Sequence, residues 1–276
     1  MQLWLAGWLW FGCAAGQAPP AVEEIMARVA ENQARAQEMR SRFVYRQKLL
    51  MRFHRGGGKL AREERHEYVV TPTAQGSRKE LERFEGRYQR GGRLVPYDQP
   101  GFEYKEIDID GEIMRDFADD LTDDKRSRDG IGRDLFPLTA DQQRHYRFAL
   151  KGRHDYRGRE VYVVTFEPHG SEDGGTWAGQ ALIDTREFQP VLVTSRLALR
   201  VPLWVKTVLG TRVKGVGFSL SYQKFDDGIW FPVSYGGEFE IRALFFYKRH
   251  MSISLGNSDF QRTDVSSRVA YALDAK

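Results

Sequence analysis

The 276-residue sequence has one cysteine, Cys13, which excludes a disulfide framework and any zinc site built from cysteines. Proline is sparse at 10 residues, whereas the 27 glycines suit many turns between strands. Hydrophobic residues make up 41% and charged residues 29%, a balance typical of folded domains. The net charge is only +4, and Lys and Arg form no dense stripe along the sequence. We therefore expect no nucleic-acid partner.

Long apolar runs are also missing. The first 16 residues are uncharged but shorter than the ~20 residues that a membrane-spanning helix needs. They end in Ala14-Ala15-Gly16, small residues typical of a signal-peptidase site. We expect a cleaved signal peptide over 1–16 and one exported domain over 17–276. A lipid anchor on Cys13 is the less favoured alternative, because only the Gly12-Cys13 pair fits a lipobox, and a retained anchor comes third.

Signatures of common enzymes are absent: the sequence has no HExxH, GxSxG, GxxxxGK[ST] or dinucleotide-binding glycine motif. Its six histidines lack metal-ligand spacing. Glu106–Gly111 resembles the start of an EF-hand, but the twelfth position of that loop would be Phe117 instead of Glu. We interpret this stretch as a strand edge leading into a turn. The sequence predicts a non-enzymatic protein without metal or other cofactor. A dispersed catalytic centre, the third hypothesis, would need His and carboxylate groups converging in a pocket.

Periodicity predicts a mainly β (α+β) fold. Helical spacing indicates helices at 21–40 and 112–124, and a capping box at Thr139 and Gln142 indicates a short third one. Alternation and turn signals predict strands at 43–53, 60–71, 78–89, 160–166, 179–184, 191–199, 216–225, 229–235, 238–248 and 251–255. Glycine turns join strands that lie antiparallel. We expect one large curved antiparallel sheet of roughly nine to eleven strands, with two or three helices covering its apolar face.

Two stretches carry motifs of a known family. Trp177–Asp184 followed by Phe188–Val193 has the strand–turn–strand pattern G-x-x-x-I-D…P, and Tyr222–Pro232 ends in D-G-x-W-F-P. With the first helix and strand, the sequence resembles the outer-membrane lipoprotein-sorting (LolA/LolB-like) superfamily and its sigma-factor-regulator relatives over most of residues 21–260. The resemblance implies a periplasmic protein shaped as an incomplete barrel, whose apolar interior holds acyl chains. It also implies an arginine that controls opening, although no motif singles out which one.

A carrier needs an apolar surface that its own side chains do not fill, because each CH₂ moved from lipid into water costs ~0.8 kcal/mol. We expect lipid or lipoprotein acyl chains as ligands. The predicted cavity lining consists of Phe43, Tyr45, Leu49, Met51, Phe218, Leu220, Tyr222, Phe239, Ile241 and Phe245. The alternative is that these side chains form an ordinary filled core, in a structural or regulatory envelope module that binds a protein partner.

One further segment, residues 200–210, places apolar side chains beside Arg200 and Lys206. Apolar residues flanked by cations suit either a lid over the cavity mouth or a transient contact with a membrane. We favour the lid. The residues concerned are Val201, Leu203, Trp204, Val205, Val208 and Leu209.

Overall fold

The computed structural model describes residues 19–73, 76–106, 108–122, 138–170, 177–197, 212–225, 227–243 and 247–263. Its helices are α1 (Val22–Arg40), α2 (Ile109–Thr122) and α3 (Ala140–Gln143), with a 3-10 turn at Gly56–Gly58. Its strands are β1 (Phe43–His54), β2 (Leu60–Thr73), β3 (Gly76–Arg90), β4 (Arg93–Tyr97), β5 (Tyr146–Tyr156), β6 (Arg159–Pro168), β7 (Trp177–Asp184), β8 (Pro190–Leu197), β9 (Arg212–Lys224), β10 (Trp230–Ala243) and β11 (Tyr247–Arg262).

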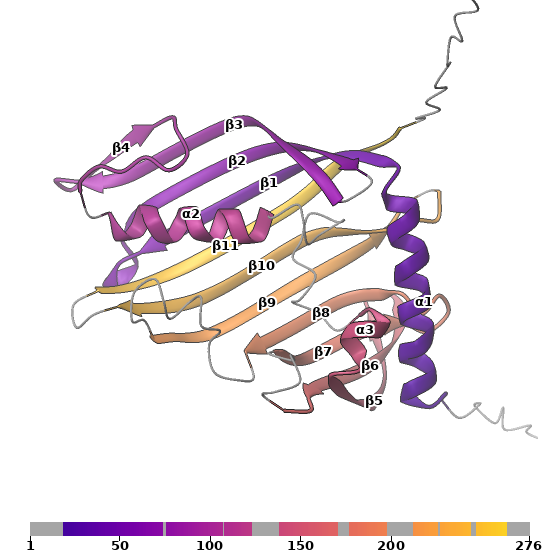
Figure 1. Ribbon diagram of the computed structural model, residues 1–276. Coiled ribbons are helices and arrows are strands. Elements are labelled where there is room, and N and C mark those ends of the chain that lie inside the picture. The colour runs from indigo at the N-terminus through magenta and orange to yellow at the C-terminus, as the bar shows by residue number, and fades with distance from the viewer. Residues whose placement is uncertain are drawn as a thin grey trace, which may run out of the picture.

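All eleven strands form a single antiparallel sheet, in the order β4-β3-β2-β1-β11-β10-β9-β8-β7-β6-β5 (Figure 1). Among the described strands, β4 and β5 each pair on one side only, so the sheet is not closed. The predicted fold class, a mainly β incomplete barrel with helices on its concave face, is confirmed.

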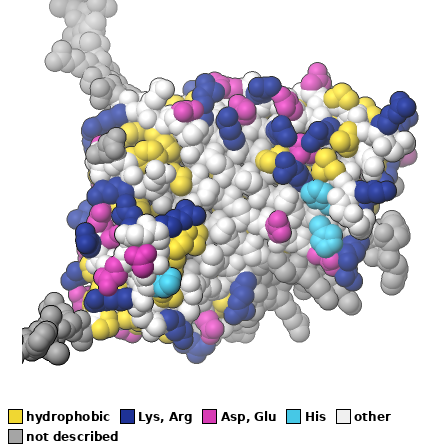
Figure 2. All heavy atoms as spheres, turned by 180° about the vertical axis from the view of Figure 1, so that it is seen from behind, with side chains coloured by type: hydrophobic (Ala, Val, Ile, Leu, Met, Phe, Trp, Pro, Cys, Tyr) yellow, Lys and Arg dark blue, Asp and Glu magenta, His cyan; other side chains and the backbone are white. Residues whose placement is uncertain are grey.

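Alternating side chains divide the sheet into an inner face under the helices and an outer face. Along β1 the odd-numbered residues from Phe43 to Phe53 are buried, as the sequence pattern predicts. The outer face carries small polar side chains at its centre, which leaves few coloured side chains in the middle of Figure 2. The small polar side chains of the outer face include Ser219, Ser221, Ser234, Ser252 and Ser254.

The helices lie on the inner face. Helix α1 runs across one end of the strands, and α2 lies over β1, β2 and β11 (Figure 1). Helix α1 buries Ile25, Met26 and Val29, and its Asn32 amide donates to the carbonyl of Glu187 at 2.7 Å. The capping box at Thr139 is present in α3. No described helix combines the length and apolar character needed to cross a bilayer.

Some predicted strand boundaries were wrong. The segments 229–235 and 238–248 were expected as two strands, but β10 continues through Gly236 and Gly237. A Cβ on Gly237 would lie 2.5 Å from Phe218 Cδ1, so this glycine makes room for an aromatic ring rather than ending the strand. The edge strands β4 and β5 were missed. β4 is short, whereas the alternation of Tyr146, Phe148 and Leu150 with exposed residues in β5 was an available signal.

Candidate functional site

Most of the predicted cavity lining lies on the inner face. Six of its side chains belong to one buried cluster: Leu49, Met51, Phe218, Leu220, Phe239 and Ile241. Tyr222 packs partly buried against the same cluster. Side chains from both long helices join it: Ile25, Met26 and Val29 of α1 and Ile113, Met114 and Ala118 of α2. The inner face is therefore largely apolar where these residues lie, and α2 lies on it.

The other three residues of the predicted lining are placed differently. Phe43 is buried in a separate cluster, where its ring meets that of Phe231 with centroids 5.0 Å apart. Tyr45 is buried beside Phe260, next to an irregularity in the pairing of β1 with β11. Phe245 lies outside the described residues, as do Cys13 and the predicted lid segment 200–210.

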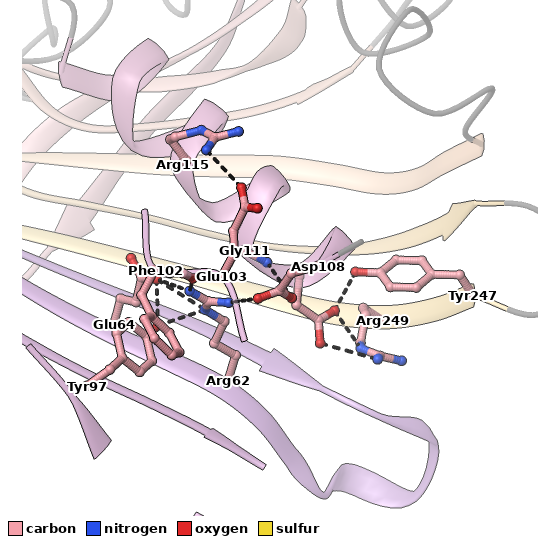
Figure 3. Close-up of polar contacts among 11 residues, drawn as sticks. Arg62, Glu64, Tyr97, Phe102, Glu103, Asp108, Gly111, Arg115, Tyr247 and Arg249 are labelled. Atoms are coloured by element: carbon pink, nitrogen blue, oxygen red, sulfur yellow. Dashed lines mark hydrogen bonds and ion pairs between the residues drawn. The ribbon is translucent and has the colours of Figure 1, made fainter. Parts of the chain in front are cut away.

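Charged side chains interrupt the apolar surface beneath α2. The inner-facing residues of β2 include Arg62, Glu64 and His66, which pair across the ladder with Phe53, Met51 and Leu49. All three polar side chains are almost fully buried. They belong to a network, here called the polar clasp, that joins the sheet to the start of α2 (Figure 3). Its members are Arg62, Glu64, Tyr97, Asp108, Asp110, Tyr247 and Arg249.

Arg62 is the centre of the clasp and is 0% exposed. Its Nη1 donates to Asp108 Oδ2 at 2.5 Å, and its Nε donates to Tyr97 Oη at 2.7 Å and to Glu64 Oε1 at 3.1 Å. Its Nη2 donates to the carbonyl of Phe102 at 2.6 Å. Buried charges are tolerated when they are paired and hydrogen-bonded in this way. The residues that contact Arg62 come from β2, β4, the loop after β4 and the start of α2.

The pKa values of Arg62, Glu64 and Tyr97 are shifted by burial and by one another. Burial alone would lower the pKa of Arg62, but the neighbouring Tyr97, Glu64 and Asp108 raise it overall. Burial alone would raise the pKa of Glu64, but hydrogen bonds from His66 and Tyr97 and the charge of Arg62 lower it below its ordinary value. Burial, together with the charge of Glu64, raises the pKa of the Tyr97 phenol. The Glu64 carboxylate and the Arg62 guanidinium therefore stay charged at neutral pH, and the Tyr97 phenol stays neutral.

The residues at the start of α2 connect to β2 and β11, the two strands that flank β1. Asp108 precedes the helix and accepts from the backbone N–H of Gly111 at 3.2 Å, as an N-terminal cap does. Two residues later, Asp110 accepts from Tyr247 Oη at 2.6 Å and from Arg249 Nε at 2.9 Å. The helix is thus held to β2 through one carboxylate and to β11 through another.

Two glycines allow this close packing. A Cβ on Gly111 would lie 2.6 Å from Arg62 Nη1, and a Cβ on Gly86 would lie 2.2 Å from the ring of its cross-strand partner Tyr97. Any larger side chain at either position would displace a member of the clasp.

The sequence interpretation of Glu106–Gly111 as a strand edge was wrong. Residues 109–111 open α2, and Asp108 caps it. The available signal was the run of acids before an apolar helical pattern, which favours a helix N-terminus. The inward charges of β2 gave no such signal, because a strand with charges on both faces predicts no buried side.

A His–carboxylate contact also lies on the inner face. His66 Nε2 is 3.1 Å from Glu64 Oε2, and Tyr68 Oη is 2.9 Å from His66 Nδ1. Glu64 is already engaged by Arg62 and Tyr97, so its carboxylate supports the clasp. In the described ranges, no three His, Cys, Asp or Glu side chains are grouped so that they could hold a metal ion.

Comparison with known proteins finds similarity in structure only. No protein-family model matches the sequence, and no curated protein matches it. A domain assigned to outer membrane lipoprotein-sorting proteins, from Vibrio parahaemolyticus, is 10% identical with a TM-score of 0.42, over 89% of this chain and 95% of that one. A DUF1329 family protein from Desulfovibrio piger is 13% identical with a TM-score of 0.41, over 89% and 94% of the two chains. A LolA superfamily protein from Nitrosomonas europaea is 12% identical with a TM-score of 0.34, over 89% and 95%. Each of these three structures is similar to this chain at low identity over most of its length.

Proposed function

We propose that this chain is a non-catalytic binding protein of the cell envelope that holds the acyl part of a lipid or lipoprotein between its inner face and α2. The observation that carries the proposal is the polar clasp. An apolar helix face (Ile113, Met114, Ala118) lies on an apolar sheet, while its start is tied to β2 and β11 by charged groups. The charged groups hold the start of α2 on the sheet, whether the rest of the helix contacts the apolar sheet or a bound acyl chain.

The physical basis is replacement of one apolar contact by another. A guest acyl chain would take the place of α2 side chains against Met51, Met251 and Ile253, so the sheet would not expose these residues to water. Methionine side chains adapt their shape to flexible partners at little cost. The clasp would meanwhile keep the helix attached at Asp108 and Asp110.

The filled-core alternative has its own support. Phe218 stacks on Tyr235 with ring centroids 5.1 Å apart and meets Trp177 edge-on at 5.2 Å. Such contacts are typical of a closed interior. In that case the chain is a structural or regulatory module, and a protein partner binds elsewhere on it.

A pair of tryptophan variants separates the two functions. Ile253 is 3% exposed on the inner face of β11, whereas its neighbour Ser254 is exposed on the outer face. If an acyl chain binds under α2, Ile253→Trp should weaken binding of a fluorescent fatty acid at least tenfold, and Ser254→Trp should leave it unchanged. Equal effects of the two variants, or no binding by the wild-type chain, would overturn the proposal.

The thermal stability of the same variants is informative. Overfilling a well-packed core costs ~1–3 kcal/mol, whereas a helix held only at its start can move away from the sheet to accept a larger side chain. A loss of that size in Ile253→Trp, together with no lipid detected by native mass spectrometry, supports the filled-core module.

The envelope location is part of the proposal and rests on the sequence of residues 1–16. The intact mass of the mature protein tests it directly. Cleavage near Gly16 supports soluble export, whereas a mature chain beginning with a diacylated Cys13 supports the lipid-anchored alternative.

A further inference from the structure

Two glycine turns at one end of the sheet have the same arrangement of charges. The β1–β2 turn reads Arg55-Gly-Gly-Gly-Lys59, and the β3–β4 turn reads Arg90-Gly-Gly-Arg93. Strands β1 and β3 run in the same direction, so both turns lie at the same end. They are level with each other, because Arg62 pairs with Tyr88 and each turn lies just beyond that pair. Neighbouring strands are ~4.8 Å apart, which puts the two turns ~10 Å apart.

The four cations of these turns, here called the basic rim (Arg55, Lys59, Arg90 and Arg93), are exposed. In the described part of the chain none of them forms an ion pair. Arg46 and Arg52, on the outer face of β1, differ because they are paired with Glu82 and Glu63. In Figure 2 the rim end lies on the right, where Lys and Arg side chains project at the margin.

The turns themselves offer an open backbone. A Cβ placed on any of their five glycines would meet no heavy atom within 4 Å. The glycines therefore do not accommodate a neighbouring side chain. Four of them adopt positive φ, as the tight turns require. With no side chains between the cations, a flat surface can approach the turn backbone closely.

Two further features lie at the same end. Leu94 follows Arg93 and is 44% exposed, which makes it one of the most exposed large apolar side chains in the described residues. The β10–β11 hairpin adds Arg242 and Lys248, which share the single carboxylate of Glu240. The hairpin therefore adds positive charge to the rim instead of neutralising it.

We infer that the basic rim is a docking surface for a membrane rich in anionic phospholipids. Level cations on bare turns fit the plane of charged headgroups, and the adjacent Leu94 can enter the interface beneath them. A polyanion would account for the charge but not for the exposed leucine, and the level arrangement of the cations favours a planar surface over an acidic protein. The rim forms only when the strands pair, which is why the linear sequence shows no basic stripe. The inference does not depend on whether the inner face holds a ligand.

Vesicle sedimentation tests the inference. We expect the full chain to bind phosphatidylcholine vesicles that contain phosphatidylglycerol and to bind pure phosphatidylcholine only weakly. Each lost cation should weaken binding about fivefold, so Arg90→Gln/Arg93→Gln should weaken it about 25-fold. Leu94→Ser should weaken it further. Raising salt from ~0.1 M to ~1 M should abolish most of the binding, because the Debye length falls from ~10 Å to ~3 Å.

A matched control has the same change in net charge. Arg147 and Lys151 are exposed on β5, at the opposite margin of the sheet. Arg147→Gln/Lys151→Gln should bind vesicles within about twofold of wild type. An equal loss in this control would show that net charge alone drives binding and would overturn the inference. So would unchanged vesicle binding in the rim variant, or rim-dependent binding of heparin without any binding of vesicles. All substitutions are at exposed positions, and matching thermal melts confirm that each variant folds.

Discussion

Replacing Asp108 by Asn removes one charge from the polar clasp while keeping its shape. Asparagine caps helices as well as aspartate does, so the start of α2 stays capped. The ion pair that is lost joins Arg62 and Asp108 at 2.5 Å, with the two side chains 0% and 1% exposed. Breaking a buried pair by removing one partner costs ~3–5 kcal/mol. Arg62 keeps Glu64, Tyr97 and Phe102, so we expect a smaller loss, about 2–3 kcal/mol, in line with a hydrogen bond to a charged group.

Denaturant unfolding at neutral pH measures this loss, and hydrogen exchange locates it. The amides of α2 should exchange faster, while those of β1 and β11 change little, because the sheet ladder is intact. Asp108→Ala also removes the cap and should cost about 1 kcal/mol more.

The control is the exposed pair of Arg115 and Glu103, 3.3 Å apart, which also connects α2 to the preceding loop. Glu103→Gln should change stability by less than ~0.5 kcal/mol. If Asp108→Asn costs no more than this control, or if exchange in α2 does not change, the clasp does not hold the helix and the reasoning fails.

Three other perturbations test the clasp. Gly86→Ala should push the Tyr97 ring out of place and lower the melting temperature by several degrees; an unchanged melt would show that the ring moves freely. Burial and Asp110 raise the pKa of Tyr247, so its contribution to stability is present below pH ~10 and is lost as the pH rises further. Tyr247→Phe should therefore unfold with a weaker dependence on pH above 10, measured by circular dichroism. The pKa of Glu64 is lowered, so its contribution to stability is present above pH ~4.3 and is lost as the pH falls. Glu64→Gln should therefore lose more stability, relative to wild type, at pH 7 than at pH 3.

The sequence predicted the elements with a strong period and missed those held by tertiary contacts. β1 was placed within one residue because its odd positions face the core, and α1 likewise because one face is apolar. The glycine pair at 236–237 was misinterpreted as a break, since nothing local shows that Phe218 will need the space. Local pattern cannot reveal a neighbour that comes from another strand.

The candidate site divides in the same way. The inner-face position of most of these apolar residues could be predicted from alternation, which reports the face on which a side chain lies. The clasp could not, because Arg62 and Asp108 are 46 residues apart and their pairing depends on where α2 lies. Whether the inner face is hollow is a matter of volume, which hydrophobic pattern does not encode.

The pairing of β1 with β11 has a consequence for how this chain reaches its folded state. Phe43 lies opposite Arg262, so β1, the first strand along the chain, completes its pairing only when β11, the last strand, is available. Strands β1–β4 and β5–β11 are each consecutive meanders, and this one ladder joins them. β11 is the last strand to leave a ribosome or an export channel that releases the chain from its N-terminus. Until β11 is available, the meander β1–β4 must persist with the edge of β1 unpaired. Removing β11 would leave two separate half-sheets.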